Sequence, residues 1–318
     1  MRKLSNKTSG IEYQKRIDRA LTFIRGNLDR PISLSDVANA ACFSEFHFHR
    51  IFSSLMHETV GEYITRKKLE HAAMRLAYSP STSVSVVADE CGYASVSSFS
   101  KSFNQWFGCR PTDIQQIKQR LDSGGGKLQT KYEKSIEANE LFVTSGEDED
   151  LFSALDEHVN IKSIDAFDVV YLTSEGGYEI ESIRNTWVKL FQLVEDAGVD
   201  WSTCERFSLS HDHPGLTPAE RCRYDACVRF PMSADSEFGS PLNLPKAHIP
   251  AGRYAIFPAE GPEDSILNQY LEFYTGWMPQ SGYEPDNFPV LEHLLPTCEI
   301  GYIQVELWAK IKPITSIF

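Results

Sequence analysis

The chain has 318 residues, and its 31 basic and 44 acidic side chains give a net charge of −13. This length allows two domains, each with its own core, and argues against a single domain. The acidic excess would argue against nucleic acid as a partner if it were evenly spread. It is not, because residues 1–120 carry 17 basic and 11 acidic side chains, whereas residues 121–318 carry 14 and 33. A basic part that can contact phosphates is joined to an acidic part, whose charge could also serve only solubility.

The seven cysteines are odd in number and show no paired spacing, so we expect reduced thiols. Cys222 and Cys227 have no further His or Cys at a spacing that would complete a tetrahedral zinc site, so we expect neither a structural metal nor a cofactor. No apolar run approaches the ~20 residues that span a bilayer, and the polar first residues lack the apolar core of a signal peptide. These features predict a cytoplasmic protein without membrane contact.

The first helical unit is predicted from residue 17 onward. Apolar side chains recur at three and four positions over residues 17–28, which is typical of an amphipathic helix, and Pro31 ends the pattern. Ser33 then reads as the N-cap of a short helix, with an acidic residue at the third helical position. A tight turn at Cys42 and Phe43 leads to Ser44, a second N-cap. The order predicts a helix-turn-helix.

The helix after Ser44 has two opposite faces. An apolar stripe of Phe48, Ile51, Phe52 and Leu55 is expected to pack inward. The other stripe, at the same spacing, consists of Phe46, His49, Arg50 and Ser53. A helix that presents an arginine, a histidine and a small hydroxyl after a short turn has what recognition of the DNA major groove requires.

The same pattern returns 51 residues later. Gly92 is a candidate C-cap and Ser95 an N-cap, and the following helix turns Phe99, Phe103 and Trp106 inward. Its outward positions are Ser97, Ser100, Lys101 and Asn104. Residues 61–76 predict a long helix between the two units, which could hold two recognition helices roughly 34 Å apart, one turn of DNA. A monomer could then bind double-stranded DNA specifically.

These residues resemble the AraC/XylS transcription regulators over about residues 11–118. The matching text is LSDVANAACFSEFHFHRIFSSLMHETVGEYITRKKLEHAAMRL, followed by SVSVVADECGYASVSSFSKSFNQWFGCRPTDI. The resemblance implies a double helix-turn-helix that binds DNA and engages RNA polymerase. Val60 stands where the family commonly has Pro, and Lys101 where it often has Arg, so we expect weaker guanine readout by the second helix. The alternative is a helical bundle that does not contact DNA.

The composition changes after residue 118. Residues 119–157 combine a glycine triplet with an acidic cluster and predict a linker between a domain at 1–118 and a domain at 158–318. Strand and helix patterns then follow in the order β-β-α-β-β, twice, and the helix of the second unit is predicted across residues 263–277. The sequence therefore predicts an all-α double helix-turn-helix domain followed by an α+β domain of two repeated units, with a cleft between them.

Residues 158–313 resemble the GyrI-like ligand-binding domain, most closely in IPAGRYAIFPAEGPEDSILNQYLEFYTGWMPQSGYEPDNFPVLEHLLP. The resemblance implies a pocket for bulky, often cationic, amphipathic molecules, with aromatic walls and a carboxylate at its base. Glu292 aligns with that carboxylate. The candidate walls are Trp187, Tyr224, Tyr254, Tyr274 and Trp277, although core packing explains any one aromatic about as well.

Three functions follow for the second domain. The first is a small-molecule sensor that controls a transcription regulator, an activator by preference. The second is a hydrolase in which Glu292 and a nearby tyrosine act on a bound electrophile, although the sequence holds no Ser/His/Asp order, phosphate loop or metal set to strengthen it. The third is a constitutive DNA binder whose acidic domain contacts another protein. The first is preferred, without enzymatic activity.

Overall fold

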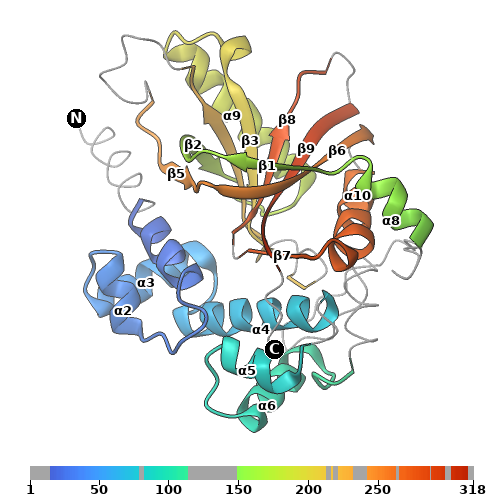
Figure 1. Ribbon diagram of the computed structural model, residues 1–318. Helices are drawn as coiled ribbons and strands as arrows, with labels where there is room; N and C mark the ends of the chain where they lie inside the picture. The colour runs from blue at the N-terminus through green and yellow to red at the C-terminus, as the bar shows by residue number, and fades with distance from the viewer. Residues whose placement is uncertain are drawn as a thin grey trace. The chain divides into compact units, whose positions relative to one another are not determined.

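The structure is a computed structural model, and it describes residues 15–78, 82–113, 149–212, 216–217, 221–231, 242–262, 265–286, 288–297 and 302–313. The chain divides into two compact units, one built around Glu12–Val143 and the other around Thr144–His213 and Thr217–Phe318 (Figure 1). Among the described residues, none of the helices is both long and apolar enough to cross a membrane.

The N-terminal unit is helical, as predicted. Residues 15–25 form the first helix, and the others are α2 (Leu34–Ala40), α3 (Glu45–Met56), α4 (Val60–Tyr78), α5 (Val84–Glu90) and α6 (Val96–Phe107). The pairs α2–α3 and α5–α6 are the two expected helix-turn-helix units. Ser33 caps α2 in a capping box with Asp36, and Ser95 caps α6 by accepting a hydrogen bond from the Ser98 amide. Ser44 stands at the N-cap of α3 without a side-chain capping bond.

Helix α4 serves both helix-turn-helix units with different parts of its length. Its first turns place Tyr63 and Ile64 in one core with Phe48 and Phe52 of α3. Its later turns, including Leu69, lie in a second core that also holds residues of α5 and α6. Each half of α4 is thus buried against a different unit, as expected of a spacer.

The two helix-turn-helix units meet at a buried lysine. The Lys68 ammonium donates to the carbonyl oxygens of Arg30 (2.8 Å) and Cys91 (2.7 Å), so α4 is tied to both units. Gly92, next to Cys91, has φ +67°, and a Cβ placed there would lie 2.8 Å from the Arg30 carbonyl carbon. The corresponding turn of the first unit has Cys42 at φ 55°. Glycine is therefore required at the second turn by both its backbone angle and this close approach.

The C-terminal unit is a mixed α/β domain with a large antiparallel sheet, which confirms that part of the predicted fold. Its helices are α8 (Glu149–Asp156), α9 (Ile180–Asp196) and α10 (Ile266–Glu272), with short helices η1 (Trp201–Thr203), η3 (Phe273–Trp277) and η4 (Met278–Gln280). Its strands are β1 (Asn160–Ile164), β2 (Phe167–Thr173), β3 (Glu205–Ser210), β4 (Tyr224–Arg229), β5 (Lys246–Ile249), β6 (Gly252–Pro262), β7 (Tyr283–Pro285), β8 (Val290–Leu294) and β9 (Tyr302–Pro313).

Two elements differ from the sequence-based expectation. The linker predicted at residues 119–157 ends earlier, because α8 occupies its last residues and packs on η3 of the C-terminal unit. The helix predicted across residues 263–277 begins at Ile266 and changes to a π-helix at Phe273. The glycine triplet and the acidic cluster lie outside the described residues.

The strands run β1-β6-β9-β8-β3-β4-β2-β5, with β7 added on β9. The sequential order is β-β-α-β-β in each half, with β7 as an extra strand in the second. β1, the first strand of the first half, lies at the outer edge of the second half beside β6. β5, the first strand of the second half, lies at the outer edge of the first half beside β2, and β3 and β8 pair at the centre. If each strand is exchanged for its counterpart in the other half, the same order is obtained in reverse. The counterparts are β1 and β5, β2 and β6, β3 and β8, and β4 and β9. The two halves are therefore related by a pseudo-twofold axis between β3 and β8.

Directly paired residues lie on the same face of a sheet, which allows the two faces to be separated. One row across the sheet contains Phe257, Leu307, Glu292, Ser208 and Ala226. Ala226 belongs to the core under α9, and Phe257 stacks on Phe273 of η3, so the helices cover this face. The opposite face has its own core, which includes Tyr171, Phe207, Tyr254 and Leu291.

Candidate functional sites

The outer face of α3 carries most of the predicted readout residues. Phe46 is 68% exposed, and His49 and Arg50 are exposed beside it. The Arg50 guanidinium lies 5.8 Å from the centre of the Phe46 ring, so the two side chains form one surface. Ser53 departs from the prediction, because its hydroxyl oxygen is buried and has no hydrogen-bond partner among the described residues.

Leu55 departs in the opposite direction. It was expected to pack inward, yet it is 46% exposed. The inward face of α3 is therefore formed by Phe48 and Phe52, which are fully buried, with Ile51 partly buried against the same core.

The outer face of α6 presents three of its four predicted residues. Ser97, Lys101 and Asn104 are exposed, and Ser100 is half-buried. Phe99 and Phe103 are buried as predicted, whereas Trp106 is only half-buried. Since Lys101 is the single charged residue on this face, α6 offers less to guanine than α3 does with Arg50.

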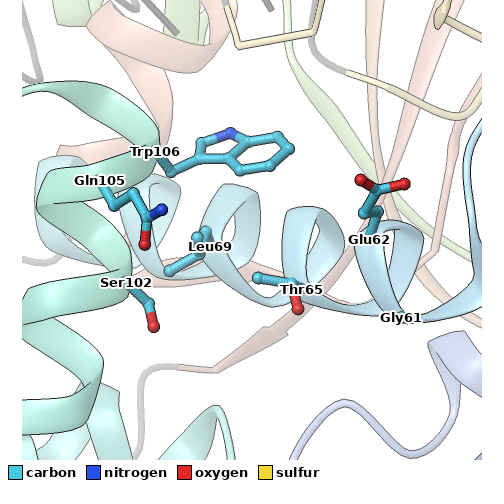
Figure 2. A pocket seen from close by; sticks show the side chains of 7 residues that line it. All are labelled: Gly61, Glu62, Thr65, Leu69, Ser102, Gln105 and Trp106. Carbon is cyan, nitrogen blue, oxygen red and sulfur yellow. The ribbon is translucent and has the colours of Figure 1, made fainter. Parts of the chain in front are cut away.

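A hollow of about 210 Å³ lies between α4 and α6 and was not predicted (Figure 2). It is lined by Gly61, Glu62, Thr65, Leu69, Ser102, Gln105 and Trp106. The Glu62 carboxylate is already engaged, because it accepts hydrogen bonds from the amide and the hydroxyl of Thr59 (3.0 and 2.9 Å). Both bonds reach Oε2, so this oxygen of Glu62 caps α4.

Glu292 lies at the centre of the helix-covered sheet face, on β8 beside the pseudo-twofold axis. It is half-buried, and its carboxylate accepts hydrogen bonds from the hydroxyls of Ser208 and Tyr270, with Ser210 at 3.4 Å. Among the described residues, no Lys, Arg or His forms a salt bridge with Glu292. The carboxylate is thus surrounded by neutral donors.

Ser208, Ser210 and Tyr270 were not predicted as site residues. Ser208 and Ser210 alternate with the buried Phe207 and Leu209 along β3, so their polar face could have been noticed as a period-two pattern. Which residues they face depends on the pairing of β3 with β8, and no local signal gives that pairing. Tyr270 reaches the site from α10, and its sequence position alone does not indicate this contact.

Aromatic side chains surround this site on the α9 side. The Trp187 indole donates to the Tyr224 hydroxyl (3.0 Å), and the Tyr224 and Tyr178 rings meet edge to face at 6.4 Å. Burial raises the pKa of Tyr224, and the nearby Glu292 charge raises it further. Burial and the same charge raise the pKa of Tyr270 well above its ordinary value. Both phenols therefore remain protonated at neutral pH.

The other predicted wall residues lie elsewhere. Tyr254 belongs to the core of the opposite face, and its hydroxyl donates to the Pro250 carbonyl (2.8 Å). The structure therefore does not bring it to Glu292. Trp277 is 1% exposed, stacks on Phe273 at 5.3 Å and donates to Asp156 of α8 (2.7 Å). It is a core residue that links two helices.

Tyr274 is also part of this packing. Its ring meets that of Phe273 edge to face at 5.1 Å, and its phenol is close enough to Tyr270 to influence the pKa there. Glu292, Trp187 and Tyr224 are the predicted residues that the structure assembles most clearly, with Tyr274 behind Tyr270.

A second buried polar cluster lies on the opposite face, at one end of β4. Asp225 contacts His211 (2.6 Å) and Arg223 (2.9 Å) and accepts a hydrogen bond from Thr173 (2.6 Å). Burial alone would raise the pKa of Asp225, but the charges of Arg223 and His211 outweigh it and lower that pKa. Thr173 comes from β2 and His211 directly follows β3, whereas Arg223 precedes Asp225 on the same segment, so the cluster links β4 to two other strands. Within the described residues, no three metal-binding side chains are grouped to hold an ion.

Comparison with known proteins is consistent with both sites. A model described as a helix-turn-helix domain matches residues 37–117, and one described as a GyrI-like small molecule binding domain matches residues 157–312. The chain is 34% identical over 100 residues to the putative HTH-type transcriptional regulator YkgA of Escherichia coli, spanning 31% of this chain and 41% of YkgA. It is 31% identical over 96 residues to the HTH-type transcriptional activator AarP of Providencia stuartii, spanning 30% of this chain and 70% of AarP.

Among solved structures, the C-terminal domain of EcmrR aligns with 49% of this chain and 98% of its own length, at 18% identity and a TM-score of 0.37. That likeness carries no functional argument. The double helix-turn-helix and these sequence relatives define the N-terminal unit as an HTH-type domain of the kind found in transcription regulators. The chain belongs to the AraC-type family, and its C-terminal domain is a GyrI-like small-molecule-binding domain.

Proposed function

We propose that the chain activates transcription in response to an amphipathic organic cation bound at Glu292. In this proposal residues 1–118 bind DNA and contact RNA polymerase, and residues 158–318, together with α8, bind the effector. Activation is favoured because AarP, which shares this type of DNA-binding region, is named an activator. The residues assigned to DNA are Phe46, His49, Arg50, Ser97, Lys101 and Asn104.

The observation that carries the ligand class is the charge balance at Glu292. Its carboxylate is half-buried, and the groups that donate to it are neutral hydroxyls. Neutral donors offset only part of the desolvation cost of a half-buried carboxylate. A cation that enters the site would therefore gain a Coulombic interaction with Glu292. Trp187 and Tyr224 supply aromatic surface for the apolar body of such a molecule.

A titration of intrinsic tryptophan fluorescence with a panel of aromatic cations tests this assignment. We expect saturable quenching that Glu292→Gln weakens at least tenfold, since the substitution removes the charge and retains the shape. Glu205→Gln is the matched control, because Glu205 is an exposed glutamate on neighbouring β3 that pairs with Arg229. Equal affinity in wild type and Glu292→Gln would reject Glu292 as the anchor.

The direct contact between Tyr270 and Glu292 also favours a second candidate. A phenol held against a carboxylate could transfer a proton to a bound electrophile, with Glu292 assisting an attack by water. Recovery of the ligand after the titration separates the two functions, because a sensor returns it unchanged and a hydrolase returns it chemically altered. No binding by any member of the panel would favour a constitutive regulator whose acidic domain contacts a protein.

A further inference from the structure

Tyr270 occupies the position where a ligand would meet Glu292. Its hydroxyl donates to Oε1 of that carboxylate, and Ser208 donates to Oε2. A cation that approaches Oε1 must therefore compete with an internal donor. Because Tyr270 belongs to α10, displacement of its side chain would shift that helix.

The helix that carries Tyr270 changes its hydrogen-bond pattern one turn later. From Phe273 to Trp277 the chain is a π-helix, in which each backbone hydrogen bond spans five residues instead of the four of an α-helix. Phe273 is fully buried between the rings of Phe257 and Trp277, at 5.5 and 5.3 Å. A shift of α10 would thus be transmitted through stacked rings, because they have no space to absorb it.

The last ring of this stack is bonded to α8. The Trp277 indole donates to the Asp156 carboxylate at 2.7 Å, and Leu155 beside it is 7% exposed. Helix α8 is the first described element after Asp113 and leads directly into β1. It is therefore the described element of the effector domain that is closest in sequence to the DNA-binding unit.

We propose that Tyr270, the π-helical turn and the Trp277–Asp156 hydrogen bond couple the state of Glu292 to α8. With the ligand site empty, Tyr270 holds α10 toward β8 and Trp277 holds α8. Displacement of Tyr270 loosens the bond to Asp156, and α8 passes the change to the chain that leads to the DNA-binding domain. The trigger rests on the proposed function, whereas the coupling itself can be measured without any ligand.

Amide hydrogen exchange on the full chain tests the coupling. Tyr270→Phe removes the hydroxyl that contacts Glu292, and we expect it to speed exchange of the α8 amides about fivefold, as loss of one hydrogen bond would. Trp277→Phe keeps an aromatic ring but removes the indole donor, and should have a similar effect. In the double variant the Tyr270 substitution should add nothing, because α8 is already uncoupled. Tyr302→Phe, on β9, is the control and should leave α8 unchanged.

Two results would overturn the proposal: wild-type exchange of α8 in Tyr270→Phe, or additive effects in the double variant. If Tyr270→Phe does not fold, Glu292→Gln weakens the same contact and replaces it in the cycle. A second measurement uses tetraphenylphosphonium and a DNA duplex that the protein selects from random sequence. Trp277→Phe should bind the cation within twofold of wild type and lose its effect on DNA affinity, whereas a retained effect would contradict the relay. If wild type does not bind the cation, the proposed ligand class fails, and the exchange result still decides the coupling.

Discussion

Replacement of Lys68 by methionine should separate the two helix-turn-helix units. The Lys68 side chain is 7% exposed, and its ammonium satisfies the carbonyl oxygens of Arg30 and Cys91. Methionine has a similar length and can occupy the space of the lysine methylene groups, but it cannot donate a hydrogen bond to either carbonyl oxygen. The substitution therefore isolates the hydrogen bonds from the packing.

The magnitude follows from those two bonds. A hydrogen bond to a charged group contributes about 1.5–3 kcal/mol, and leaving a buried acceptor unsatisfied costs about 1–3 kcal/mol. Burial lowers the pKa of Lys68, so part of this gain is offset by desolvation of the ammonium. We expect a net loss of about 3 kcal/mol, which lowers the Tm of a domain of this size by roughly 15 °C.

Calorimetry on the full chain resolves the unfolding of the DNA-binding unit from that of the effector domain. Lys15→Met is the matched control, because Lys15 is a half-buried lysine on the first helix of the same unit. DNA affinity should also fall, since the spacing of α3 and α6 is no longer fixed by α4. A Tm within about 2 °C of the Lys15→Met value would refute the argument that Lys68 joins the two units.

Five further substitutions test other parts of the structure. Gly92→Ala should destabilise the DNA-binding unit by about 2 kcal/mol or more in a denaturant titration, since it combines a positive φ with a backbone clash. Cys42→Gly, at the equivalent turn, should change stability by less than about 0.5 kcal/mol, because relief of its φ of 55° is offset by glycine entropy. Arg50→Ala should weaken specific DNA binding by about 1–3 kcal/mol in an anisotropy titration, whereas Ser53→Ala, whose hydroxyl is buried, should leave it unchanged. Asp225 has a lowered folded pKa, so its contribution is complete above its unfolded pKa of about 3.9 and is lost as pH falls below that value. Thermal melts should therefore show a gap between wild type and Asp225→Asn at pH 7 that narrows toward pH 3; a constant gap would contradict the assignment.

The helices of the DNA-binding unit were predictable because their signals are local. N-caps such as Ser33 and Ser95, and a glycine at the turn, act within a few residues of where they stand. Ser53 and Leu55 were assigned to the wrong surroundings for a physical reason. Periodicity gives the direction of a side chain around the helix axis, but not whether another segment covers that part of the helix.

The polar cluster around Glu292 was predictable only in part, because its geometry depends on strand pairing. Period-two alternation places Tyr254 and Phe257 on opposite faces of β6, and this much was available from sequence. Which of those faces carries Glu292 follows from the β6–β9–β8 register, which no local pattern specifies. Tyr270 joins the site only after that register is fixed.

The pseudo-twofold axis explains why a repeated fold has a single charge at its centre. Ser208 and Glu292 pair directly across the axis, so each occupies in its own half the position that the other occupies in the second half. A symmetric pair of carboxylates there would repel, and one would hold a proton and lose its charge. A serine at one position instead donates a hydrogen bond to the carboxylate at the other. The difference between the two halves at this position thus leaves one carboxylate at the junction, near aromatic side chains, as the proposed cation ligand would need.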